Sequence, residues 1–131
     1  MESETPVANH LFDIAEDATK LSRTDAYFFH HFVAQILYLS NIAHTDIHMI
    51  VSFLCTRVRY TVNDDYKNMI RVVKYIPGTI SLPLILSIDN YVNIKWYVDA
   101  AFLVHKDMRG YTGGLVTMVT GGAYVQSRSK Y

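Results

Sequence analysis

One acidic residue, Asp99, stands inside the run Trp96–Phe102, whose other members are apolar or small. Alternation along a strand would place Asp99 on the same face as Tyr97 and Ala101, which offer it no charge. Because an ionised carboxylate is costly to bury alone, Asp99 must be exposed, paired with a base, hydrogen-bonded or used as a metal ligand. The run therefore marks Asp99 as the first candidate for chemistry and leaves these alternatives open.

Histidines provide a second candidate. His44 and His48 are four residues apart in a segment with helical periodicity, a spacing that can bind a metal ion. No third ligand is evident beside them, so we interpret both as partly exposed side chains. The adjacent His30 and His31 are interpreted as packing or polar-contact residues rather than ligands.

Three bases, Lys67, Arg71 and Lys74, recur at helical spacing and therefore share one face of a predicted helix. Arg57 and Arg59 could extend this basic strip. The strip is either a solvated face or a surface that contacts phosphates. Such a small number of bases can give only salt-sensitive binding that does not read nucleotide sequence.

Helical periodicity precedes Gly78 and must position these side chains. The predicted helices are 27–40 with Thr24 as N-cap, about 46–58 with Thr45 as N-cap, and about 64–76 with Asn63 as N-cap and Pro77 and Gly78 as its end. Their expected buried residues are Phe28, Phe29, Phe32, Val33, Ile36, Leu37, Ile47, Ile50, Val51, Leu54, Val58, Tyr66, Met69, Ile70 and Val73.

After Gly78 the hydrophobic period changes to two, and β-branched and aromatic residues become frequent. The predicted strands are 83–89, 93–104, 114–120 and 123–127, with Gly121 and Gly122 as a two-residue turn and GYTGG (110–114) as a strand-entry turn. The expected fold class is α+β, with an N-terminal helical lobe followed by an antiparallel β-meander.

Composition limits the classes of function. Twelve basic and twelve acidic residues give a formal net charge of zero, so bulk charge does not recruit nucleic acid or an acidic membrane. The single Cys55 cannot form an intramolecular disulfide, and no secretory signal or membrane-spanning run is evident. We therefore expect an intracellular protein, in the cytoplasm or nucleus, that is not secreted.

Five segments carry a resemblance to a known protein family: FHHFVAQILYLS (29–40), DIHMIVSFLCTRV (46–58), DDYKNMIRVVKYIPGT (64–79), WYVDAAFLVHKDMRGYTGG (96–114) and GGAYVQS (121–127). In these segments the chain resembles the polyprotein of Copia-type LTR retrotransposons. They cover about residues 11–129 in the family's order. The resemblance implies a thumb- or connection-like helical lobe at 27–80 and an incomplete, truncated RNase H-like sheet at 81–131. Residues 1–26 hold six acids and two bases, so we expect an acidic leader there, partly disordered or helical.

The resemblance also gives Asp99 a role, because it occupies the position of the first acidic residue of the RNase H active site. That site binds two Mg²⁺ ions about 4 Å apart through several carboxylates. The family's S-S-T-E-A-E helix and Y-V-D-D motif are not in this sequence, and NIAHTDI (41–47) and YIPGT (75–79) lack bases that the family has. Asp99 is thus expected to be a remnant catalytic residue and a weak, incomplete metal site.

Two functions follow as expectations. The first is a truncated reverse transcriptase and RNase H fragment without autonomous catalysis, which needs no cofactor although the intact family uses Mg²⁺. The alternative is a non-catalytic nucleic-acid-binding module that uses the basic strip Arg57, Arg59, Lys67, Arg71 and Lys74 on an RNA/DNA hybrid. We expect no membrane partner, and expect self-association through an uncovered sheet edge at the last strand.

Overall fold

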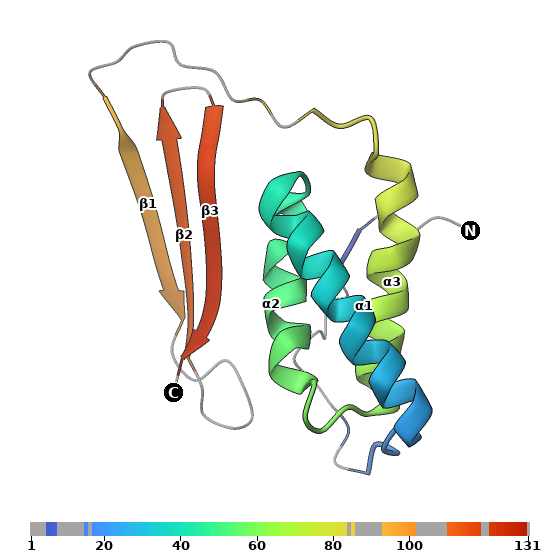
Figure 1. Ribbon diagram of the computed structural model, residues 1–131. Coiled ribbons are helices and arrows are strands. Elements are labelled where there is room, and N and C mark those ends of the chain that lie inside the picture. The colour runs from blue at the N-terminus through green and yellow to red at the C-terminus, as the bar shows by residue number, and fades with distance from the viewer. Residues whose placement is uncertain are drawn as a thin grey trace.

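A helical lobe precedes an antiparallel sheet, as the change of hydrophobic period near Gly78 predicts (Figure 1). The computed structural model describes residues 5–7, 15, 17–83, 85, 93–101, 110–118 and 121–130, with Met118 and 121–130 described by their backbone only. The helical lobe holds α1, a short 3-10 turn, α2 and α3, and the sheet holds β1, β2 and β3. The predicted α+β class is therefore confirmed.

Helix α1 (Arg23–Ile42) begins earlier than its apolar stripe indicates. Ser22 caps it, because the Ser22 hydroxyl oxygen accepts a hydrogen bond from the backbone N–H of Asp25 at 3.1 Å. The predicted cap, Thr24, lies inside the first turn. A cap residue is the one whose side chain accepts a hydrogen bond from an unpaired N–H group of the first turn. Hydrophobic spacing marks only the buried part of a helix, so it placed the start of α1 too late.

The second and third helices also differ from expectation at their ends. Thr45–Ile47 form a 3-10 turn that leads into α2 (His48–Arg57). Helix α3 (Asn63–Thr79) has Val62 as its N-cap residue and continues through Pro77 and Gly78. The prediction that Pro77 and Gly78 end the helix was therefore wrong. Pro77 lies in the last turn, where its missing N–H removes only one hydrogen bond, and this loss does not end the helix.

The core lies between the three helices. Its fully or almost fully buried apolar side chains are Phe29, Val33, Ile36, Ile47, Ile50, Val51, Phe53, Leu54, Met69 and Val72. Most were expected, but Phe28 is 54% exposed, and Val72 is buried in place of Val73. The helix period limits a buried face to about 100°, and the neighbouring helices decide which residue at its margin is covered.

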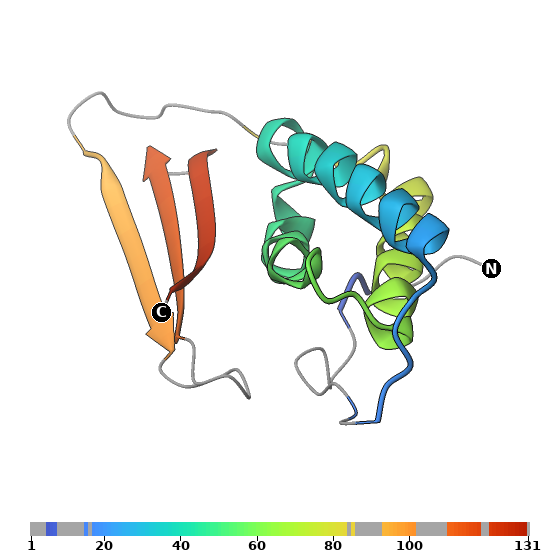
Figure 2. The ribbon, with the colours of Figure 1, turned by 60° about the horizontal axis from the view of Figure 1, so that its bottom comes forward.

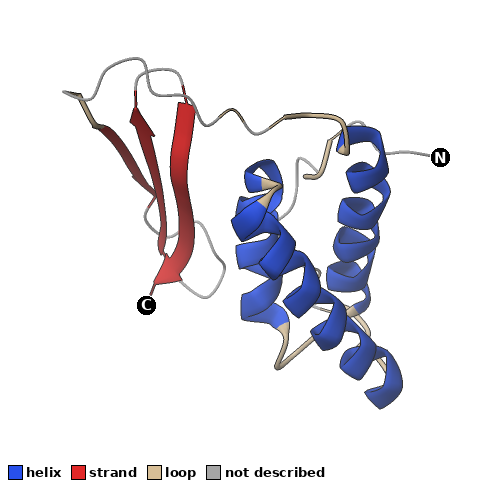
Figure 3. Ribbon diagram, turned by 45° about the horizontal axis from the view of Figure 1, so that its top comes forward, coloured by secondary structure: helices blue, strands red, loops and turns tan. Residues whose placement is uncertain are grey.

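The sheet has the order β1-β2-β3 with antiparallel neighbours (Figure 3). Its strands are β1 (Lys95–Ala101), β2 (Gly110–Met118) and β3 (Gly121–Lys130). The positions of two predicted turns were wrong. GYTGG lies within β2, and Gly121 and Gly122 pair with Met118 and Thr117 inside the ladder instead of forming the turn. The predicted strand 83–89 falls mostly outside the described residues.

The sheet approaches the helical lobe through β3, which contacts α2 (Figures 1 and 2). Tyr111 of β2 donates a hydrogen bond from its hydroxyl to the backbone oxygen of Met49 at 2.7 Å. Strand β1 is the strand farthest from the helices in all three ribbon views. Among the described helices, none has the length and apolar character needed to cross a membrane.

Candidate functional site

Asp99 lies near the middle of β1, where all seven residues are exposed. Its side chain emerges on the face shared with Lys95, Tyr97 and Ala101. Of the alternatives that the sequence left open for Asp99, the structure shows an exposed carboxylate. No desolvation cost requires it to have a partner.

The residue opposite Asp99 in β2 is Gly113, which has no side chain. A Cβ built on Gly113 would meet no atom within 4 Å, so the space beside Asp99 is open. On the same face of the sheet, the pairs on either side of Asp99 are Tyr97 with Leu115 and Ala101 with Tyr111. Asp99 is thus surrounded on its own sheet face by neighbours that bring no second carboxylate.

A paired-magnesium site needs several oxygen ligands that converge, because Mg²⁺ keeps its waters when only one carboxylate is present. The described part of the chain contains no group of three or more His, Cys, Asp or Glu side chains that could hold a metal ion. Within the described residues, Asp99 alone therefore offers Mg²⁺ at most a weak site. A clamp for in-line phosphate hydrolysis needs further carboxylates, and the described strands place none beside Asp99.

The five bases of the predicted strip do not form one free surface. Lys67 binds the Asp64 carboxylate at 2.8 Å. Arg71 donates to the backbone oxygen of Thr5 at 3.0 Å and to its hydroxyl at 2.9 Å. Lys74 is exposed. Two of the three bases on α3 therefore have intramolecular partners that a phosphate would have to displace.

Arg57 binds a buried carboxylate. Its Nε lies 3.1 Å and 3.3 Å from the two carboxylate oxygens of the fully buried Asp65. The backbone N–H of Val62 also donates to Asp65 at 2.9 Å, which fixes the start of α3. Burial raises the pKa of Asp65, although the Val62 N–H and the Arg57 guanidinium oppose that rise. Arg57 thus compensates a buried charge, and a phosphate would have to compete with Asp65 for its guanidinium.

The two histidines of the predicted pair have different polar partners. His44 Nδ1 lies 3.4 Å from the carboxylate of Asp46. His48, expected to be partly exposed, is buried, and its Nδ1 lies 3.2 Å from the hydroxyl of Ser40. Burial lowers the pKa of His48, so the site favours the neutral imidazole. Each histidine therefore has its own local partner among the described residues, Asp46 for His44 and Ser40 for His48.

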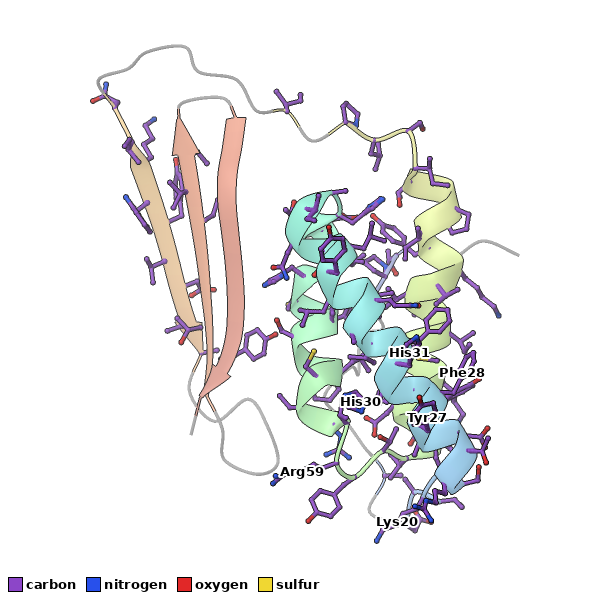
Figure 4. The ribbon with its side chains drawn as sticks, in the orientation of Figure 1. Lys20, Tyr27, Phe28, His30, His31 and Arg59 are labelled. Atoms are coloured by element: carbon purple, nitrogen blue, oxygen red, sulfur yellow. The ribbon has the colours of Figure 1, made fainter. Side chains whose placement is uncertain are left out.

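Exposed aromatic and basic side chains lie around the lower half of the helical lobe, on α1, on the segment before it and on the turn after α2 (Figure 4). We name this group the aromatic–basic surface, and its exposed residues are Lys20, Tyr27, Phe28, His30, His31 and Arg59. Tyr27 is 75% exposed, and the ring of Phe28 stacks on that of Phe32 with centroids 5.5 Å apart. An exposed aromatic ring supported by a second ring is a platform on which a planar group could stack.

Backbone pairing brings the bases of this surface toward α1. Lys20 forms an isolated antiparallel bridge with Val62, and Leu21 donates to the backbone oxygen of Thr61 at 3.2 Å. These contacts join the segment before α1 to the turn that contains Arg59. Sequence reasoning missed the surface because Phe28 was assigned to the core, and the bridge between positions 20 and 62 leaves no periodic signal.

Comparison of the chain with protein-family models, with curated proteins and with solved structures gives no match in any of the three.

Proposed function

We propose that the chain is a retrotransposon-derived segment of reverse transcriptase and RNase H type, which serves as a scaffold and does not catalyse hydrolysis on its own. The supporting observation is the environment of Asp99. This carboxylate stands in the first strand of an antiparallel three-stranded sheet that follows a helical lobe, and it faces Gly113 rather than a second ligand. The order of these elements agrees with the order that the Copia resemblance implies.

The proposed role is structural, because the ligands that catalysis needs are not assembled around Asp99 among the described residues. Hydrolysis of a phosphodiester by two Mg²⁺ ions depends on carboxylates that hold both ions at once. Asp99 can supply one carboxylate ligand, and this carboxylate is exposed to water. In this proposal Asp99 keeps the position of a first acidic ligand, and the described strands offer no second carboxylate on that face.

The test is an assay on an RNA/DNA hybrid with a labelled RNA strand, incubated with the purified 131-residue chain and Mg²⁺. We expect no cleavage above the buffer rate, and no difference between the wild type and Asp99→Asn. Mg²⁺-dependent cleavage that co-elutes with the chain in gel filtration and disappears in Asp99→Asn would contradict the proposal.

A second candidate function is non-catalytic binding of nucleic acid, and the aromatic–basic surface favours it. Stacking of bases on aromatic rings and attraction of phosphates by nearby cations are the two features that non-specific single-strand binders combine. Tyr27 and Phe28 offer the rings, while Lys20 and Arg59 offer the cations. This surface suits the function better than the α3 strip, whose Lys67 and Arg71 already have partners.

We expect a fluorescein-labelled single strand to bind with an affinity that falls steeply with salt. Loss of one stacking ring costs about 1–3 kcal/mol, so Tyr27→Ala should weaken binding by about fivefold or more. Tyr38→Ala is the matched control, because Tyr38 lies on the same helix and is 71% exposed. An equal effect of both variants, or a larger effect of Lys74→Ala, would assign binding to another surface.

A further inference from the structure

Strand β1 has an outer edge with which no other described strand pairs. Every residue of this strand is exposed, including Trp96 at 69% and Val98 at 71%. An edge strand that presents unpaired backbone groups and apolar side chains is a template for pairing with another strand. Because β1 lies on the side of the sheet opposite the helices (Figures 1 and 2), a second strand could approach it without meeting the helical lobe.

The charges on this edge are self-complementary. Lys95 and Asp99 share one face of β1 and are four residues apart, about 13 Å along the strand, so they cannot pair with each other. The structure gives neither of them an ion-pair partner among the described residues. In an antiparallel arrangement of two β1 strands centred on Tyr97, each Lys95 stands opposite the partner's Asp99.

Charge selects this register over its neighbours. A two-fold pairing centred on Val98 places Asp99 opposite the partner's Tyr97, and one centred on Asp99 places two carboxylates side by side. Opposite charges stabilise a directly cross-strand pair, and like charges destabilise it. Only the register centred on Tyr97 forms two Lys–Asp pairs, and it also places Trp96 opposite the partner's Val98 on the other face.

We propose that the outer edge of β1 binds the same edge of a second copy of this chain, antiparallel and centred on Tyr97, to form a continuous six-stranded sheet. Two copies of the three-stranded sheet would then be joined through their outermost strands, with the two helical lobes at opposite ends. A seven-residue strand is a small interface, so the dimer should be weak and should depend on concentration. This inference does not depend on the proposed function.

A charge-exchange experiment tests the register. Lys95→Asp gives a chain with two acids on the edge, and Asp99→Lys gives a chain with two bases. We expect each variant alone to dimerise about tenfold or more weakly than the wild type, because two attractive pairs become two repulsive pairs. An equimolar mixture of the two variants should form a heterodimer, and the double variant should dimerise like the wild type. Sedimentation velocity across a concentration series measures all four.

Cross-linking tests the same register independently, in a Cys55→Ser background. Tyr97→Cys should form a covalent dimer under mild oxidation, because the two cysteines would stand opposite each other within the Cα separation that a disulfide needs. Val98→Cys is the matched control and should cross-link much less. Circular dichroism and thermal unfolding verify that each variant remains folded, since none of these changes touches the helical core.

Three outcomes would overturn the proposal. The first is a wild-type chain that stays monomeric up to about 1 mM, as expected if a segment of the same chain covers β1. The second is a mixture of Lys95→Asp and Asp99→Lys that fails to associate. The third is preferential cross-linking of Val98→Cys, which would place the centre of any dimer at another residue.

Discussion

Replacement of Arg57 by alanine should lower the free energy of unfolding by about 3 kcal/mol at neutral pH, because it leaves a buried carboxylate without its cation. Asp65 is fully buried, and Arg57 donates to both of its carboxylate oxygens. The Val62 N–H would remain as a donor to Asp65. One backbone hydrogen bond does not replace a guanidinium, so the ionised form of Asp65 becomes costly.

The effect of Arg57→Ala should depend on pH. The folded-state pKa of Asp65 is already raised by burial, and removal of Arg57 takes away a group that lowers it. A carboxyl whose folded pKa exceeds its unfolded pKa destabilises the fold most above the folded pKa, and that penalty is relieved as the pH falls toward about 4. The difference in stability between wild type and variant should therefore be largest near pH 7 and shrink on acidification.

Urea unfolding at several pH values measures this prediction. Lys67→Ala is the matched control, because it removes the exposed pair with Asp64 and should cost no more than about 1 kcal/mol at any pH. Asp65→Asn should cost less than Arg57→Ala, since it removes the buried charge and keeps an acceptor. A loss for Arg57→Ala that equals the control, or that grows on acidification, would contradict the assigned role of the pair.

Replacement of Phe29 by alanine should lower the free energy of unfolding by about 3–5 kcal/mol. Phe29 is fully buried in the core between the helices, where its neighbours cannot fully close the cavity that a truncated ring would leave. Such a loss is a large fraction of the stability of a domain of this size. We expect Phe29→Ala to unfold at a much lower denaturant concentration than the wild type.

The adjacent residue gives a matched control. Phe28→Ala removes the same ring from a position that is 54% exposed, so we expect a loss of about 1 kcal/mol, which includes the stacking on Phe32. Denaturant unfolding followed by circular dichroism at 222 nm compares the two variants under the same conditions. Equal losses would show that the apolar face of α1 is oriented differently from the structure.

The sequence predicted which helices and strands form more accurately than it predicted where each one begins and ends. Hydrophobic spacing located α1, α2 and α3, because a helix that buries one face must repeat apolar residues at the helical period. It assigned both Phe28 and Phe29 to the core, because they are neighbours on the helix and equally apolar, but only Phe29 is buried. Which of the two is buried depends on where α2 and α3 lie. Similarly, two adjacent glycines indicate a turn, but the register with Met118 and Thr117 places them inside β3.

The sequence by itself determined the α+β class, the isolation of Asp99 among apolar neighbours and the helical spacing of the bases, because these depend only on residue type and local period. Only the tertiary structure decided that Arg57 is committed to Asp65, that His48 is buried against Ser40, and that Lys20 lies beside the turn that contains Arg59. Each of these contacts joins different segments of the chain, and packing rather than sequence spacing selects such partners.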